Sequence, residues 1–160
     1  MSVRPANFVD IPRIVEIIRE AHGRSVYAGR GEVDATYAKR LLAQSIQRHG
    51  GTHEGSTLVL VSERAGAVEG VIVGMLDRVQ VFGDKLWATD LFFIGTRKMP
   101  PMDALAMLNG LAEWAEKAPA CIEVKVGVTS VVGDWQRAKG LYERAGFAQV
   151  GALYERRIER

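Results

Sequence analysis

Apolar residues in the first part of the chain recur every three or four positions, the period of a helix with one buried face. One such run begins at Asp10, in the position of an N-cap, and ends near Gly23. Its apolar face is formed by Ile11, Ile14, Val15, Ile18 and Ala21. A second run covers residues 34–48. Both patterns predict amphipathic helices that pack against a core.

Beyond Thr57 the pattern changes to β-branched and apolar runs interrupted by glycine, which is typical of strands and hairpin turns. Two helical patterns return later in the chain, the first of them after a break at Pro100 and Pro101. The predicted strands cover residues 2–6, 57–63, 70–82, 86–94, 120–128 and 148–158, and the later helices cover residues 102–117 and 133–145.

The predicted element order is β-α-α-β-β-β-α-β-α-β, with short connections between the middle strands. Strands joined by tight hairpins run antiparallel. The strands at 86–94 and 120–128 are instead linked through a helix, so we expect this pair to be parallel, with a right-handed crossover. The sequence therefore predicts one α/β (α+β) domain over residues 1–160. Its sheet is mixed and mostly antiparallel, with helices on both faces.

The composition permits a sizeable core and does not favour nucleic acid as a partner. Apolar residues make up 48% of the 160 positions, and the net charge is only +2. No stretch approaches the roughly 18 apolar residues of a membrane helix. The single cysteine, Cys121, cannot form an internal disulfide, and we interpret it as a buried strand thiol. The three histidines form no metal-binding motif. We therefore expect a cytoplasmic protein without membrane contact.

Three parts of the sequence resemble a known family. They are VRPANFVDIPRIVEIIREAH, then ATDLFFIGTRK with the following ALAMLNGLAEWAEK, and finally LYERAGFAQVGALYERR. Together with the element order, they resemble the GNAT superfamily of N-acetyltransferases. They correspond to its opening strand and first helix, its central strand and cofactor-binding helix, and its closing helix and strands. The chain is most similar in appearance to GNAT-like proteins encoded by bacteriophages. The resemblance covers nearly the whole chain.

This resemblance implies an acyl-CoA-dependent N-acetyltransferase with acetyl-CoA as co-substrate and with a primary amine of a small molecule or a protein as acceptor. In the family, the central parallel strand pair splays apart, and the pantetheine arm pairs with the central strand like an additional strand. The corresponding residues here are Leu91, Phe92, Phe93 and Ile94. We expect the thioester to lie in the gap between these residues and the strand at 123–128.

The resemblance also implies two catalytic residues. Tyr142, by its place in LYERAGF, corresponds to the acid that protonates the leaving thiolate, because a phenol can donate a proton without carrying charge at neutral pH. Asp90 precedes the cofactor-pairing segment and could act as the base that accepts the amine proton. A structural alternative stands beside each role. Tyr142 could pack its ring under the sheet, and Asp90 could anchor a neighbouring loop.

The segment before the cofactor-binding helix departs from the family pattern. Relatives carry a glycine-rich loop whose backbone N–H groups bind the pyrophosphate. Here Pro100 and Met102 take the glycine positions, and Ala104 takes a small-residue position. Pro100 and Pro101 remove two amide donors.

Charged residues of the same segment change the expected binding of phosphate. Asp103 adds a negative charge to the first helical turn, where it suits the helix dipole but repels phosphate. Arg97 and Lys98 could compensate with charged side chains, or could simply be solvated. Asp134 is expected to cap the fourth helix, and it stands near the position of an asparagine that contacts the cofactor in relatives.

Two interpretations of function remain open at this stage. The first is the N-acetyltransferase. The second is a non-catalytic GNAT-like interaction or structural module, such as a phage particle would use, which has lost conventional acetyl-CoA binding. The proline-containing loop favours the second, whereas Tyr142 and Asp90 favour the first. The final predicted strand could also pair across a homodimer.

Overall fold

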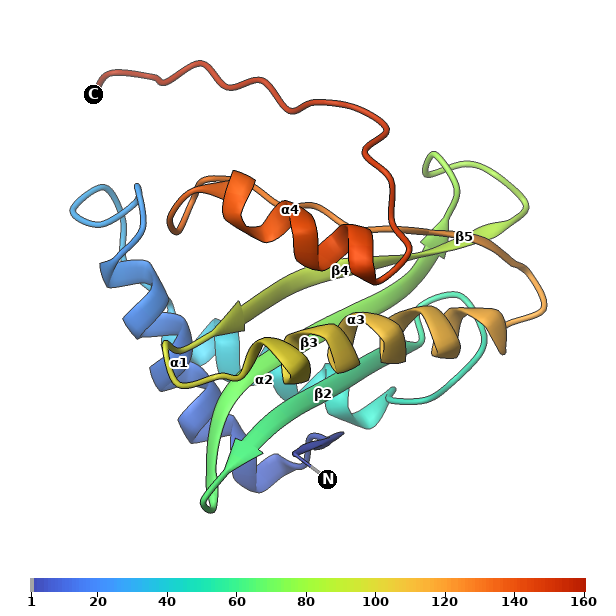
Figure 1. Cartoon of the computed structure of the whole chain (residues 1–160), viewed down its shortest axis with the longest axis horizontal. Helices are drawn as coiled ribbons and strands as arrows, with labels where there is room; N and C mark the ends of the chain where they lie inside the picture. The colour runs from blue at the N-terminus through green and yellow to red at the C-terminus, as the bar shows by residue number, and fades with distance from the viewer. Residues whose placement is uncertain (1) are drawn as a thin grey trace.

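The computed structural model describes residues 2–160 (Figure 1). Its elements are β1 (Val3–Pro5), a short 3-10 helix η1 (Phe8–Asp10), α1 (Ile11–Gly23), α2 (Ala35–Gln47), β2 (Thr57–Arg64), β3 (Ala67–Arg78), β4 (Leu86–Gly95), α3 (Pro101–Glu116), β5 (Cys121–Lys125) and α4 (Trp135–Arg144). The two early helices, the two later helices and the first five strands are all close to their predicted positions.

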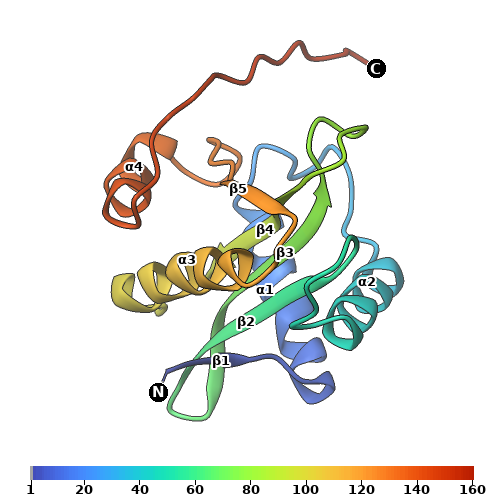
Figure 2. The same cartoon turned by 90° about the vertical axis from the view of Figure 1, so that its right-hand side faces the viewer.

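The strands form one five-stranded sheet in the order β1-β2-β3-β4-β5. The first three contacts between neighbouring strands are antiparallel, and β4 with β5 is parallel. Helices α1 and α2 cover one face of the sheet, and α3 and α4 cover the other (Figure 2). The mixed sheet with a parallel pair and helices on both faces confirms the predicted fold class.

The core is divided into two layers by the sheet. One layer packs α1 and α2 against valines of β2 and β3, and the other packs α3 against the opposite side chains of the same strands. Members of the second layer with no solvent exposure include Ile72, Leu76, Met107, Leu108 and Leu111. Alternation along each strand therefore distributes apolar side chains to two separate cores.

The start of α1 differs from the predicted capping. Asp10 lies at the N-cap position, but its side chain makes no capping hydrogen bond to α1. Its carboxylate instead accepts hydrogen bonds from both terminal nitrogens of Arg4 at 2.9 Å and from the backbone N–H of Asn7 at 2.8 Å. Asn7 caps the preceding 3-10 turn through Val9 N–H. Asp10 thus ties the first strand to the first helix.

The prediction of a final strand at residues 148–158 is wrong for this structure. The chain beyond Phe147 has no regular secondary structure, and it is exposed to its last residue. The apolar side chains of this tail have almost no partners, since Val150, Leu153 and Tyr154 are 80%, 82% and 92% exposed. A strand needs a neighbour for its backbone N–H and C=O groups, and the tail lies apart from the sheet (Figures 1 and 2).

A buried carboxylate joins the start of helix α3 to β2 and to the residue before β1. Asp103, in its first turn, is only 5% exposed. It accepts hydrogen bonds from Ser2 Oγ at 2.7 Å and from Ser62 Oγ at 2.6 Å, and Arg64 Nε lies 3.8 Å away. Burial alone would raise the pKa of Asp103, but these two hydroxyls and the charge of Arg64 outweigh burial and lower it. Asp103 is therefore held as an anion between α3, β1 and β2.

Replacing this carboxylate should destabilise the fold. We expect Asp103→Ala to lower the free energy of unfolding by about 2–4 kcal/mol, because Ser62, which has no solvent exposure, loses its partner. Urea unfolding measures the change. Glu113→Ala, an exposed position of the same helix, is the control and should change stability by less than about 0.5 kcal/mol.

The stabilities of wild type and Asp103→Ala should also depend differently on pH in acid. Since the pKa of Asp103 is lowered in the folded state, its contribution is present above the ordinary carboxyl pKa and is lost as the pH falls through the folded value. The stability difference between wild type and Asp103→Ala should therefore shrink in strongly acidic solution. An equal difference at all pH values would contradict the assigned role.

Candidate functional site

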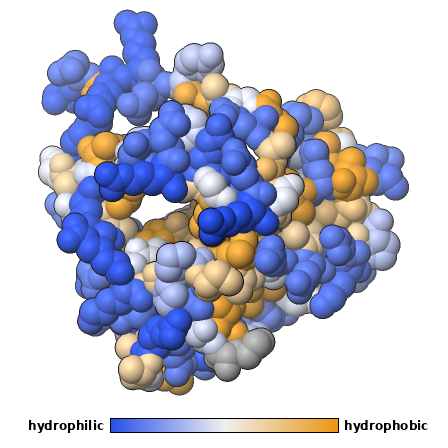
Figure 3. All heavy atoms as spheres, viewed as in Figure 1, coloured by the Kyte–Doolittle hydropathy of each residue, from blue (hydrophilic) through white to orange (hydrophobic). Residues whose placement is uncertain are grey.

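The parallel strands β4 and β5 separate part of the way along their length. Their pairing begins at Leu86 with Cys121 and ends at Thr89 with Lys125. From Asp90 to Gly95, β4 is paired with β3 on one side and has no strand on the other. The surface is hollowed between α4 and the carboxyl end of β4 in Figure 3. The fork leaves Leu91, Phe92, Phe93 and Ile94 without a strand partner on that side, and their pairing with a cofactor stays a prediction.

A β-bulge lies at the point where the strands separate. Gly74 of β3 is opposite Asp90, and the preceding residue, Val73, is opposite Phe92, so Leu91 is the additional residue. A shift of one residue exchanges the two faces of a strand. As a result, Phe92 packs with the α1 and α2 layer, whereas Phe93 packs with the α3 layer. Leu91 remains 40% exposed at the mouth of the fork.

Asp90 occupies the apex of the fork. Its Oδ1 accepts a hydrogen bond of 3.1 Å from the backbone N–H of Gly127, which follows β5. The carboxylate therefore bridges the two diverging strands. Burial raises the pKa of Asp90, and the hydrogen bond from Gly127 offsets only part of this effect. Asp90 is thus both the loop anchor considered from the sequence and a carboxylate with an increased affinity for protons.

Tyr142 lies on α4. Its ring packs against the α3 layer and makes an edge-to-face contact with Phe147, with 6.2 Å between the ring centroids. Burial, with a smaller contribution from the negative charge of Asp90, raises the pKa of Tyr142 to about 12. The phenol therefore remains protonated at neutral pH, close enough to Asp90 for the two groups to interact.

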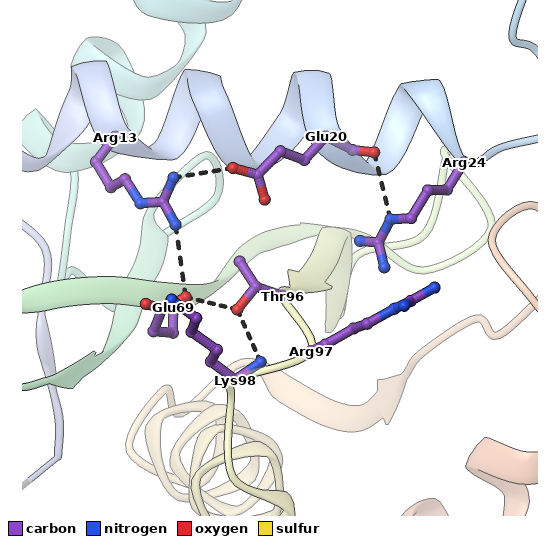
Figure 4. A pocket seen from close by; sticks show the side chains of 7 residues that line it. All are labelled: Arg13, Glu20, Arg24, Glu69, Thr96, Arg97 and Lys98. Carbon is purple, nitrogen blue, oxygen red and sulfur yellow. Dashed lines mark hydrogen bonds and ion pairs between the residues drawn. The ribbon is translucent and has the colours of Figure 1, made fainter.

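The sequence-predicted phosphate side chains lie in a pocket at the end of β4. Its volume is about 420 Å³. Arg97 and Lys98 line it from the loop after β4, and residues that the sequence alone did not indicate complete it, namely Arg13, Glu20, Arg24, Glu69 and Thr96 (Figure 4). Four cations and two carboxylates leave this lining with a net charge of 4 − 2 = +2.

The two carboxylates of this pocket are already engaged. Glu69 is 5% exposed, accepts a hydrogen bond from the Thr96 hydroxyl and pairs with Arg13 at 3.5 Å. Glu20 also pairs with Arg13, at 3.0 Å. Within residues 2–160, no carboxylate forms an ion pair with Arg24, Arg97 or Lys98. In Figure 4, Arg97 extends from its loop toward the end of α1 that carries Arg24. The pocket is therefore suited to an anion.

The remaining residues of the phosphate segment are distributed around the start of α3. Pro100 is the N-cap, Pro101 the first helical residue, and Met102 is 67% exposed. Asp103 and Ala104 are buried. The Asp103 carboxylate is directed toward Ser2 and Ser62, which donate hydrogen bonds to it, and Arg64 Nε lies 3.8 Å away. The repulsion of phosphate that we expected from Asp103 is consequently weaker than the sequence suggested.

Asp134 caps α4, as predicted, by accepting a hydrogen bond of 3.0 Å from the backbone N–H of Gln136. This contact uses one oxygen of its side chain. A contact with a cofactor stays a prediction for this residue.

Comparison with solved structures finds the same fold in acetyltransferases. The chain matches a putative acetyltransferase from Agrobacterium tumefaciens str. C58 with a TM-score of 0.70 and 16% identity, over 99% of this chain and 100% of the other. The chain has the GNAT fold.

Two further solved structures match at similar coverage. A ribosomal-protein-alanine N-acetyltransferase from Brucella melitensis biovar Abortus 2308 has a TM-score of 0.64 and 16% identity, over 99% and 100% of the two chains. A glucosamine-6-phosphate N-acetyltransferase from Arabidopsis thaliana has a TM-score of 0.67 and 11% identity, over 98% and 97%. No protein-family model matches the sequence, and no curated protein matches it significantly. Among the described residues, no helix is long and apolar enough to cross a membrane.

The environment of Asp90 makes a testable prediction about stability. Because the folded state raises the pKa of Asp90, its ionised form costs stability at neutral pH, and the cost disappears below the ordinary carboxyl pKa. We therefore expect Asp90→Asn to melt at pH 7 no lower than wild type, and any gain to vanish in acid. Asp84→Asn, in an exposed turn, is the control. A clear loss of thermal stability at pH 7 would show that the carboxylate is instead a net structural support.

Proposed function

We propose that the protein is an acyl-CoA-dependent N-acetyltransferase that transfers the acetyl group of acetyl-CoA to a primary amine by direct attack. The observation that carries this proposal is the fork between β4 and β5. A strand with one unpaired edge can bind an extended amide-containing arm, because the backbone N–H and C=O groups there still need partners. The pantetheine arm has two amides and is of this kind.

The chemical step needs one group that accepts a proton and one that donates a proton. The amine nitrogen attacks the thioester carbon while the Asp90 carboxylate takes the amine proton, and a backbone N–H of β4 stabilises the oxyanion. The carbon–sulfur bond then breaks, and the Tyr142 hydroxyl protonates the thiolate. Solvent exchange returns a proton from Asp90 to Tyr142. The products are an N-acetylated amine and free coenzyme A.

Arg24, Arg97 and Lys98 supply the positive charge for the phosphate groups of acetyl-CoA in this proposal. Pro100 and Pro101 lack backbone N–H groups, so the start of α3 offers fewer amide donors than a glycine-rich loop would. Charged side chains can replace such donors, since a hydrogen bond to a charged group contributes about 1.5–3 kcal/mol. Asp103 does not oppose this arrangement, because its carboxylate is bound to Ser2 and Ser62.

The second candidate is a GNAT-like interaction or structural module without catalysis. The two prolines at the start of α3 are the observation in its favour. Isothermal titration with acetyl-CoA separates the two candidates. The transferase should bind with a Kd below about 1 mM, and the absence of heat at any usable concentration would favour the module.

Arg97 and Lys98 should contribute to this affinity. We expect Arg97→Ala with Lys98→Ala to weaken acetyl-CoA binding at least ~10-fold, because the loss of two charge-assisted contacts removes more than 1.4 kcal/mol. Lys85→Ala, an exposed cation at the opposite end of β4, serves as the control and should leave the Kd unchanged. Equal affinity in both variants would remove this pocket from the proposal.

Tyr142 and Asp90 should affect turnover more than binding. With a set of primary amines and detection of the released thiol, we expect Tyr142→Phe and Asp90→Asn each to lower kcat by about 10²–10⁴-fold. The acetyl-CoA Kd should change little. Tyr37→Phe, on α2, is the control for the phenol. Since the pKa of Asp90 is raised, wild-type rates should fall as the pH decreases through that value. An unchanged rate in Tyr142→Phe would exclude it as the acid.

A further inference from the structure

The loop between β4 and α3 carries two of the cations that line the pocket. Arg97 and Lys98 are both exposed, and they lie in a turn formed by residues 96–99. A long exposed side chain loses conformational freedom when it is fixed on a ligand, and this loss weakens binding. A backbone that already directs both cations toward the pocket reduces the loss. The contacts that hold this loop therefore bear on how tightly the pocket binds an anion.

Thr96 holds the first end of the loop. Its backbone N–H donates to the carbonyl of Glu69 at 2.8 Å, and its hydroxyl donates to the Glu69 carboxylate at 2.5 Å. The hydroxyl oxygen also accepts a hydrogen bond of 3.1 Å from the backbone N–H of Lys98. The Thr96 carbonyl accepts one of 3.2 Å from the backbone N–H of Met99. Main chain and side chain of Thr96 thus join the loop to β3 and close its turn.

Arg13 of α1 fixes the Glu69 carboxylate in turn. Glu69 is 5% exposed, and a buried carboxylate needs a charged or hydrogen-bonding partner. Arg13 Nη2 lies 3.5 Å from it, and Nε donates to the carbonyl of Val68 at 3.0 Å. Nη1 donates to the carboxylates of Glu16 at 3.1 Å and Glu20 at 3.0 Å. All three nitrogens of Arg13 are engaged, so this cation supports Glu69 and, through it, the loop (Figure 4).

Met99 holds the second end of the loop. Gly70 of β3 and Gly95 of β4 are paired across the two strands, and the Met99 side chain lies against both. A Cβ at either glycine would overlap the side chain of Met99. Met99 also packs against the α3 layer of the core. The lack of side chains at this one strand pair therefore leaves the space that Met99 occupies.

We propose that Thr96 and Met99 are positioning residues, which hold the loop so that Arg97 and Lys98 face the pocket before a diphosphate group binds. The two prolines at the start of α3 give the reason, because side-chain cations must do more where backbone N–H donors are few. This inference rests on the proposed function in one respect, that the diphosphate is the one of acetyl-CoA. Inorganic pyrophosphate is a probe of the same chemistry that needs no acetyl transfer.

Thr96→Val is the first test, because it removes the hydroxyl and keeps the shape and charge of the site. By isothermal titration, we expect it to weaken the binding of inorganic pyrophosphate by about 3–10-fold, since the loop loses two of its hydrogen bonds. Thr96→Ser retains the hydroxyl and should bind as wild type does. Thr36→Val, at an exposed position of α2, is the control and should leave the affinity unchanged. Equal affinities of Thr96→Val and wild type would overturn the proposal.

Glu69→Ala separates positioning from direct electrostatics, because the two predict opposite signs. The substitution removes a negative charge from the lining of the pocket and releases Arg13. Electrostatics alone therefore predicts tighter binding of pyrophosphate. The loss of the Thr96 anchor predicts binding that is weaker by at least ~3-fold. Tighter or unchanged binding would show that Glu69 only repels the anion, and would reject its support of the loop.

Gly95→Ala tests the second end of the loop. The added methyl group takes space that Met99 occupies, and we expect the displaced loop to bind pyrophosphate about 3–10-fold more weakly. Gly31→Ala, where a Cβ meets no atom within 4 Å, is the control. An affinity equal to that of wild type in Gly95→Ala would contradict the role of Met99.

The transferase and the positioning role fail in different ways. A wild-type protein that binds pyrophosphate but not acetyl-CoA, with weaker binding in Thr96→Val, would reject the transferase and support the positioning role. Binding of acetyl-CoA with the same affinity in wild type and Thr96→Val would reject the positioning role alone. A wild-type protein that binds neither ligand would reject both.

Discussion

The separation of β4 from β5 after four paired positions is the feature on which the rest of the site depends. Two constraints maintain it. The bulge at Leu91 changes the direction of β4 at that point, and Asp90 binds the backbone N–H of Gly127 across the gap. The same carboxylate that holds the fork is the one whose pKa burial raises. Structural support and proton affinity therefore come from one group.

At the start of helix α3, prolines stand where relatives have a glycine-rich loop, and residues elsewhere in the fold supply positive charge in its place. Pro100 and Pro101 give the helix a rigid start but remove N–H donors from its N-terminus. The negative charge of Asp103 is turned inward, where Ser2 and Ser62 satisfy it. Positive charge reaches the pocket instead from Arg97 and Lys98 in the loop and from Arg24 directly after α1. The anion site is thus assembled from segments that are far apart in the sequence.

The carboxyl-terminal part of the chain is much less tightly packed than α3. Helix α4 has no fully buried residue, and within residues 2–160 no hydrogen bond joins residues 148–160 to the rest of the fold. The catalytic candidate Tyr142 is in α4, directly before this region.

The amphipathic periods, the turn residues and the predicted element order by themselves determined the fold class, with its parallel strand pair and helices on both faces, because each depends on local spacing. The place of the fork, and Asp90 and Tyr142 beside it, came from the resemblance to the GNAT superfamily. Only the tertiary structure decided that the Asp103 carboxylate binds Ser62, that Arg24 lines a pocket with Arg97, and that residues 148–158 form no strand. The physical reason is that the partner of a charged group or of a strand edge is whichever group the fold brings near it. The spacing of residues along the sequence does not reveal which distant residues become neighbours in space.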